Sequence, residues 1–177
     1  MKQISCLSVN RVTNLGIMTV LALAFILAAV SPSPAAPEPG VNKDTRCAVC
    51  GMFVARYPNW IAKIVLKNGK TEYFDGPKDM LAYYFSPAKY GGTSPSDFKA
   101  VMVQDYYTLK WLDARKAFFV VGSDVHGPMG KEFIPFASEG AAKSFAGDHK
   151  AHMIMKFDQI TMAQDEAMRG SQMMKMK

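Results

Sequence analysis

The chain is poor in the residues that most often carry catalysis, with three cysteines and three histidines among 177 residues. It has no phosphate-cradling glycine loop, no ordered serine, histidine and aspartate signal, and no carboxylate pair marked for acid–base work. Its longest apolar run falls short of the roughly 20 residues that a transmembrane helix needs. The sequence therefore predicts a binding protein and not an enzyme.

Dense runs of one charge are also missing. Lysine and arginine give a formal net charge of +6 but are scattered, and no nucleic-acid motif is present. Loss of the leader described next lowers this charge to +4, because Lys2 and Arg11 leave and no acidic residue does. We expect no nucleic-acid partner, whereas a basic face toward an acidic protein or anionic lipid headgroups stays open.

Residues 1–36 have the pattern of a signal peptide. Lys2 and Arg11 precede the apolar run at 17–30, and small residues follow it, with Ala35 and Ala36 as cleavage positions. Cys6 precedes that run, and no cysteine follows it directly, as a bacterial lipoprotein would require. We expect export to the periplasm. An uncleaved N-terminal anchor, and hence membrane attachment, is the alternative.

The exported part keeps two cysteines, both in the motif Cys47-Ala48-Val49-Cys50-Gly51-Met52. Thiolate and thioether are soft ligands that favour Cu(I) over oxygen-seeking ions. Cys50 and Met52 are two apart, so an extended segment places both side chains on one face. Gly51 between them leaves room for a bend and for an ion. The motif predicts a loop or strand-entry site for one soft ion.

The rest of the chain predicts an α+β fold of two related small β-β-α-β units. In the first, strands at 60–66 and 71–74 flank an Asn68-Gly69 turn, Asp75 caps a helix from Pro77 to about Phe85, and residues 99–103 form a strand. In the second, strands at 116–121 and 132–136 precede a helix capped by Ser138 and a strand at 152–157. The predicted organisation is a linker at 37–46, units at 47–104 and 105–163, and a methionine-rich disordered tail at 164–177. Weak copper capture by that tail is the alternative to a purely disordered role.

Several of these motifs together resemble the NosL family of nitrous oxide reductase accessory proteins. They are Cys-x-x-Cys-Gly-Met after an export signal, the Phe74-Asp75 corner, the segment from Val121-Gly122-Ser123 to the Gly-Pro-Met-Gly at 127–130, and the Phe136 corner. The resemblance spans residues 47–160. It implies two related α+β units and a periplasmic Cu(I)-binding chaperone that delivers copper for the reductase's copper centres.

The resemblance also implies ligands and partners. The family's Cys-Gly-Met ligands fall on Cys50 and Met52. Nitrous oxide reductase, or another periplasmic copper enzyme, would be the client, and a copper donor protein would load the chaperone. Many family members are lipoproteins, whereas this chain lacks the lipoprotein cysteine.

Two other readings of the cysteine pair stay open. Cys47 and Cys50 could form a disulfide or act as a thiol–disulfide oxidoreductase, although a thioredoxin-like motif follows a strand, and here it precedes the first one. A structural zinc site could instead combine them with His149 and His152, which would leave Met52 without a role.

Three more candidate ligands come from the sequence. Cys47 lies in the same loop as Cys50, and Met129 lies between glycines, where an apolar side chain has little reason to be. His126, three residues earlier, would complete a site of sulfur, sulfur and nitrogen. The alternatives are a loop methionine folded onto the core and a surface histidine.

Overall fold

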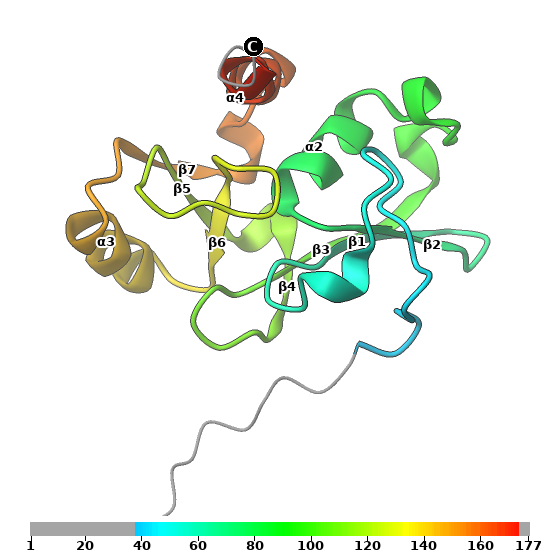
Figure 1. The fold of residues 1–177 in the computed structure, drawn as a ribbon, viewed down its shortest axis with the longest axis horizontal. Helices are drawn as coiled ribbons and strands as arrows, with labels where there is room; N and C mark the ends of the chain where they lie inside the picture. Colours follow the sequence, from blue (N-terminus) through cyan, green and yellow to red (C-terminus); the bar gives the residue numbers. More distant parts are fainter. Residues whose placement is uncertain (1–37, 174–177) are drawn as a thin grey trace, which may run out of the picture. The chain divides into compact units, whose positions relative to one another are not determined.

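The computed structural model describes residues 38–173; the predicted signal peptide and residues 174–177 lie outside this range. The strands are β1 (Ala62–Leu66), β2 (Thr71–Phe74), β3 (Phe98–Gln104), β4 (Trp111–Asp113), β5 (Phe118–Val121), β6 (Ile134–Phe136) and β7 (Met153–Lys156). The helices are α2 (Pro77–Phe85), α3 (Glu139–Asp148) and α4 (Met162–Met173) (Figure 1). Short 3₁₀ turns lie at Val54–Arg56, Pro87–Tyr90, Pro95–Asp97, Ala114–Lys116 and Phe157–Gln159.

The strands form two antiparallel sheets of matching order. The first is β2-β1-β3-β4 and the second is β6-β5-β7. In each, two sequential strands pair, a helix follows, and the next strand returns to the other side of the first. The predicted α+β class and the repeated β-β-α-β order are confirmed.

Local sequence explains the first hairpin. Side chains of β1 alternate between buried and half-buried, with Ala62, Ile64 and Leu66 facing the core. The turn needs a positive φ, which Gly69 supplies at +89°, and the amide of Gly69 donates to the carbonyl of Leu66. The predicted Asn-Gly hairpin is therefore present.

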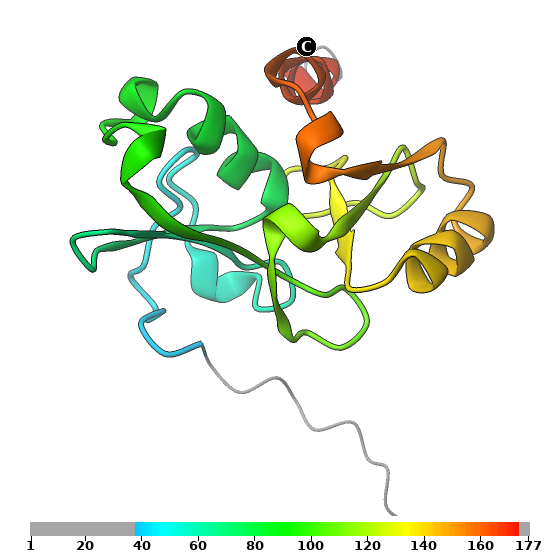
Figure 2. The ribbon, with the colours of Figure 1, turned by 180° about the vertical axis from the view of Figure 1, so that it is seen from behind.

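The larger core cluster joins the two halves. It contains Ile64, Phe74 and Leu81 from the first half together with Phe119 and Phe133 from the second. A smaller cluster of Val120, Ile134, Phe136, Ala142 and Phe145 lies beneath α3. Figure 2, the view from behind, shows α3 and α4 over different parts of the second sheet.

Strand β4 was not predicted. Residues 37–46 were predicted as a linker, and Glu38 in this segment contacts the first sheet. β4 has only three residues and pairs with β3, so it extends the first sheet. Glu38 accepts a hydrogen bond of 2.7 Å from the indole of Trp111 and forms an ion pair with Lys63. Because these contacts join residues far apart in the sequence, no local pattern predicts them.

The prediction of a disordered tail was wrong for the described part of it, because α4 runs to Met173. Thr161 and Gln164 bond reciprocally at its start, the side chain of each accepting from the backbone amide of the other. Asp165 is buried, and Arg169 forms an ion pair with Asp79 of α2. The capping box and the ion pair of Arg169 hold this helix, and Met168 packs against the larger core cluster.

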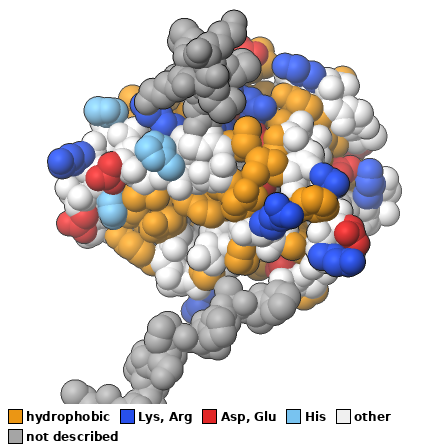
Figure 3. Space-filling view, viewed as in Figure 1, with side chains coloured by type: hydrophobic (Ala, Val, Ile, Leu, Met, Phe, Trp, Pro, Cys, Tyr) orange, Lys and Arg blue, Asp and Glu red, His pale blue; other side chains and the backbone are white. Residues whose placement is uncertain are grey.

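On the face seen in Figure 3, lysine and arginine side chains lie apart from one another among neutral and apolar ones. This face therefore carries no continuous basic patch. Within residues 38–173, no helix combines the length and the apolar character that crossing a membrane requires.

Candidate metal centre

The cysteine motif forms a tight loop between Arg46 and Phe53, which make an isolated antiparallel bridge. The amide of Cys47 donates to the carbonyl of Met52 at 2.8 Å, and the amide of Gly51 donates to the carbonyl of Cys47 at 3.0 Å. Gly51 has a φ of +76°, a conformation that side-chain-bearing residues rarely adopt. The loop is held by its own backbone, so the two thiols are positioned before any ion arrives.

This loop lies beside the start of α2 (Figure 1), where two carboxylates meet the two thiols. Ligand atoms of Cys47, Cys50, Asp75 and Asp79 all lie within 4.8 Å of one another. The Cys47 thiol donates to Oδ2 of Asp79 at 3.3 Å, and the Cys50 thiol lies 3.5 Å from both Asp75 oxygens. Cys47 is buried, whereas Cys50 is half-buried and closer to solvent.

The strand-to-helix corner explains where the carboxylates point. Asp75 was predicted to cap α2, and this was wrong: the N-cap is Gly76, which makes no side-chain cap bond. The Asp75 carboxylate instead accepts from Cys50. Asp79 lies in the first turn of α2, where the helix dipole favours negative charge. Both carboxylates are at most 2% exposed.

A buried charge network surrounds these groups. Asp79 pairs with Arg169 of α4. The amide of Lys78 donates to Oε1 of Glu132 at 2.5 Å, and its ammonium donates to the carbonyls of Met129 and Lys131. Burial raises the pKa of Glu132 to about 8 and lowers the pKa of Lys78. Acidic groups outnumber basic ones in this network, and the raised pKa values of Glu132 and Asp75 mean that protons neutralise part of its negative charge.

The Cys47 thiol is held in its protonated form by the same surroundings. The pKa of Cys47 is raised, first by its hydrogen bond with the Cys50 side chain, then by burial and by the charges of Asp79 and Asp75. Burial, followed by the charge of Asp79, raises the pKa of Asp75. Since a thiol must lose its proton to bind a soft metal, ion binding here is coupled to proton release.

Cys50 and Met52 share a solvent-facing pocket of about 250 Å³, which is also lined by Arg46, Gly51, Phe53, Arg56 and Tyr57. The guanidinium of Arg46 lies 3.6 Å from the centroid of the Phe53 ring, and that of Arg56 lies 5.1 Å from it. The lining of this pocket therefore combines two arginines and two aromatic rings with Cys50 and Met52.

The other predicted ligands are placed differently. The loop at residues 127–130 is closed by two backbone bonds between Gly127 and Gly130, and Lys78 holds it to α2 through the Met129 carbonyl. The Met129 side chain is half-buried. His126 is exposed and does not belong to the cysteine and aspartate cluster found among the described residues.

The zinc set considered from the sequence is not assembled within residues 38–173. His149 bonds Asp124 at 2.9 Å, and His152 lies beside Gly122. Neither histidine joins the cluster of the two cysteines. Both cysteines are free thiols in the structure.

Sequence reasoning missed Asp75 and Asp79 as members of the site. Asp75 was given a capping role because aspartate before a helix usually caps it. The available signal was the pair itself, two carboxylates four residues apart at the start of a helix, one before and one inside the first turn. The buried Lys78 between them is a second sign that this turn faces the interior.

The sequence of this chain matches a known protein family. The NosL family model matches residues 39–164. The copper-binding lipoprotein NosL of Stutzerimonas stutzeri is 30% identical over 135 residues, covering 71% of this chain and 67% of that protein.

Two solved structures are also similar. The crystal structure of the copper chaperone NosL from Shewanella denitrificans matches with a TM-score of 0.60 and 26% identity, covering 76% of this chain and all of that one. The solution structure of apo-NosL from Achromobacter cycloclastes matches at 28% identity and a TM-score of 0.44, covering 59% of this chain and 87% of that one. NosL is a family of copper chaperones and not of enzymes, and by the extent of the family match this chain belongs to it.

Proposed function

We propose that this protein is a periplasmic chaperone that binds Cu(I) through Cys50 and Met52 and delivers it to a copper enzyme, nitrous oxide reductase first among them. The observation that supports this most is the shared pocket of Cys50 and Met52, which opens to solvent while the Cys50 thiol reaches the buried cluster. A thiolate and a thioether in one small opening suit a soft monovalent ion.

Each surrounding group has a role in this proposal. Cys47, the more buried thiol, is a third sulfur donor from the same loop. Asp75 and Asp79 lie at hydrogen-bond distance from the two thiols, so they are placed to take the protons that leave when Cu(I) binds. Arg169 holds Asp79 in place from α4. Met129 and His126 remain weaker candidates, since the residues 127–130 reach α2 by backbone contacts.

Release follows from the open side of the site. Cu(I) commonly takes two to four ligands, so a partner's histidine or methionine can enter through the pocket mouth before Cys50 leaves. The ion stays Cu(I) throughout, and transfer is an exchange of ligands. Arg46 and Arg56 at the mouth would favour a partner with an acidic surface around its own copper entry.

A competition titration with Cu(I) tests this function. We expect one tightly bound ion per reduced chain, loss of tight binding in Cys50→Ser, and a smaller loss in Met52→Leu, since a thioether is the weaker ligand. Met102→Leu, a change on β3 outside the cysteine loop, is the matched control. Unchanged Cu(I) affinity in Cys50→Ser would overturn the proposal.

The same samples separate the chaperone from a thiol–disulfide oxidoreductase. The chaperone should load apo nitrous oxide reductase from a stoichiometric Cu(I) complex and show no insulin reduction. Insulin reduction that depends on Cys47 and Cys50, without copper transfer, would favour the oxidoreductase.

A further inference from the structure

The pocket at the cysteine loop contains two arginine side chains and no acidic one. Arg46 and Arg56 line it together with Cys50 and Met52, the two predicted copper ligands. Both arginines are exposed. Positive charge without a compensating carboxylate therefore lies directly beside the sulfur atoms of this pocket.

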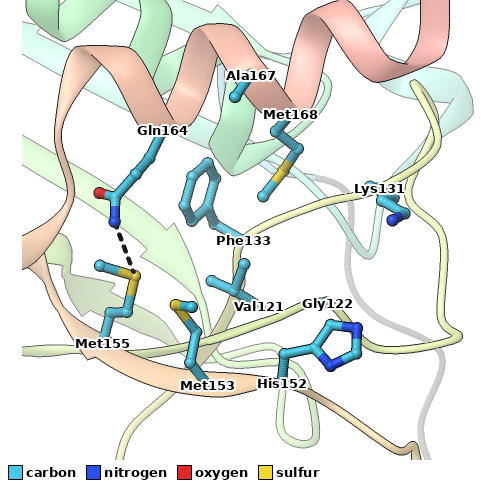
Figure 4. A pocket seen from close by; sticks show the side chains of 10 residues that line it. All are labelled: Val121, Gly122, Lys131, Phe133, His152, Met153, Met155, Gln164, Ala167 and Met168. Atoms are coloured by element: carbon cyan, nitrogen blue, oxygen red, sulfur yellow. Dashed lines mark hydrogen bonds between the residues drawn. The ribbon is translucent and has the colours of Figure 1, made fainter.

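Two other pockets lack this arrangement. The pocket of about 580 Å³ that contains Arg115 and Lys156 also contains Asp158, an acidic group of its own. The pocket between β7 and α4 is lined mainly by apolar side chains, and Lys131 is its one charged residue (Figure 4). At the cysteine loop, in contrast, two cations meet with no acidic residue in the lining.

Both guanidinium groups lie near one aromatic ring. That of Arg46 is 3.6 Å from the centroid of the Phe53 ring, and that of Arg56 is 5.1 Å from it. The face of an aromatic ring attracts a cation, so Phe53 holds both side chains at the pocket. Neither arginine forms an ion pair with an acidic group of residues 38–173. A carboxylate from another molecule would therefore not have to displace one from this part of the chain.

Arg46 is also part of the cysteine loop. Its guanidinium donates to the carbonyl of Gly51 at 3.0 Å, and its backbone makes the bridge to Phe53. A guanidinium has five N–H donors, so the bond to Gly51 leaves others for a carboxylate. A carboxylate bound to Arg46 is thus held beside the segment that joins Cys50 to Met52. Arg56 has no such bond to the loop among the described residues.

We propose that Arg46, Phe53 and Arg56 form the docking site for an acidic segment of the copper-accepting partner, whose carboxylates lie next to its own methionine or histidine ligand. This inference rests on the proposed copper site at Cys50 and Met52. The planar fork of an arginine binds a carboxylate through two parallel hydrogen bonds, which fixes its orientation. The partner's copper ligand then enters the pocket beside Cys50, and Cu(I) changes ligands without a change of oxidation state.

The first experiment measures docking without copper, so its result does not depend on the proposed chaperone function. The probes are two fluorescent synthetic peptides, in which Met-Gly-Met follows either three aspartates or three asparagines. Fluorescence anisotropy with the reduced, copper-free chain gives both affinities. We expect the aspartate peptide to bind at least about tenfold more tightly at low ionic strength, and this difference to shrink as salt screens the charges.

Leucine substitutions locate the docking site, since leucine removes the charge and adds no copper ligand. Arg46→Leu and Arg56→Leu should each weaken binding of the aspartate peptide at least about fivefold. Arg115→Leu is the matched control, because Arg115 is also exposed but lies outside this pocket. Equal affinity for the two peptides, or an equal loss in Arg115→Leu, would overturn the proposal. Arginine-dependent binding to phosphatidylglycerol vesicles, with no preference for the aspartate peptide, would overturn it in favour of a membrane surface.

The second experiment tests the link between Arg46 and the loop. Each variant is loaded with Cu(I), and transfer to the uncharged asparagine peptide is followed with time. Arg46→Leu should release Cu(I) roughly threefold to tenfold faster than wild type, because the bond to the Gly51 carbonyl is lost. Arg56→Leu should release it at the wild-type rate. Equal rates in the two variants would show that Arg46 does not position the loop. Absence of Cu(I) binding in the wild type would refute the chaperone function and leave the peptide affinities interpretable.

Discussion

The two β-β-α-β halves differ most at the corner where the second strand enters the helix. In the second half, Phe136-Ala137-Ser138 forms an ordinary helix start: the Ser138 hydroxyl accepts from the amide of Ala141 at 3.2 Å. In the first half, Phe74-Asp75-Gly76 stands at the same place, Gly76 makes no side-chain cap bond, and the Asp75 carboxylate turns to Cys50.

The helices that follow differ in the same sense. The first turn of α2 is buried, with Lys78 and Asp79 at most 2% exposed, whereas Glu139 and Gly140 at the start of α3 are exposed. A missing cap costs about 1 kcal/mol, and buried charges cost more. The first half is thus less stable at this corner, where the carboxylates of Asp75 and Asp79 face the two thiols. The second half keeps the stable, capped arrangement at Ser138. The predictions below test this difference.

The largest effect should come from a methyl group added at Gly76. A Cβ there would lie 2.5 Å from Oε2 of Glu132, which cannot retreat because its carboxylate is buried and bonded to the amides of Lys78 and Phe133. We expect Gly76→Ala to lower the free energy of unfolding by roughly 3 kcal/mol. Urea unfolding measures it.

Gly140→Ala is the counterpart in the second half, where nothing lies within 4 Å of the added methyl. It should raise stability by about 0.5–1 kcal/mol, as expected for alanine in place of glycine within a helix. Equal losses in both variants would show that the two corners are equally constrained.

The ion pair of Arg169 should come next. Arg169→Met leaves Asp79, 2% exposed, without this partner, and a loss of about 2 kcal/mol is expected after allowing for the partial exposure of the arginine. Lys143→Met breaks the exposed pair with Glu139 on α3 and should cost far less, because water screens this pair. Thermal unfolding of both variants checks the order, and a loss of similar size in both would contradict it.

A third prediction concerns pH. The pKa of Glu132 is raised by burial from its ordinary value of 4.5 to about 8, so the folded chain holds a proton that the unfolded chain releases. Stability from this proton is complete below about pH 4.5 and is lost as pH rises toward 8. The free energy of unfolding should therefore fall across this window.

Glu132→Gln should flatten the slope of stability against pH. Asp165, whose pKa is raised by burial to about 7, acts in the same direction and keeps part of the slope. Glu139→Gln on the exposed start of α3 is the control, since Lys143 lowers the pKa of Glu139 and its titration lies below the window. If the slope of the free energy of unfolding against pH is unchanged in Glu132→Gln, Glu132 is not the source of that slope.

The smallest effect concerns thiol acidity. The charge of Asp75 contributes to the raised pKa of Cys47, after the Cys50 hydrogen bond, burial and Asp79. Asp75→Asn should therefore shift thiolate formation to lower pH, measured by ultraviolet absorbance of reduced protein. Asp124→Asn, at an exposed position beside His149, should leave the titration unchanged. If thiolate formation in Asp75→Asn shifts to higher pH instead, the charge of Asp75 does not raise the pKa of Cys47.

Much of the fold followed from local patterns, and what failed depended on distant contacts. The strand at 71–74 and the helix from Pro77 to Phe85 were predicted with the observed ends, because turn and helix-start residues mark them. β4 and α4 were missed, since Trp111 pairs with Glu38 and Arg169 with Asp79 across long sequence separations.

The site shows the same division. The cysteine loop was predicted as a loop, because its spacing and Gly51 are local features. The carboxylates of Asp75 and Asp79 were not assigned to it, because only the folded corner turns them toward the thiols. The roles of Cys50, Met52, Cys47, Met129 and His126 as copper ligands remain predictions.

X-ray absorption of protein loaded with less than one equivalent of Cu(I) tests the central claim most directly. We expect the first coordination shell of copper to be dominated by sulfur. This shell should contain one sulfur fewer in Met52→Leu and should lose most of its sulfur in Cys50→Ser. Met153→Leu should leave it unchanged. A shell of oxygen and nitrogen, or a sulfur shell that neither Met52→Leu nor Cys50→Ser alters, would contradict the assignment of Cu(I) to the cysteine loop.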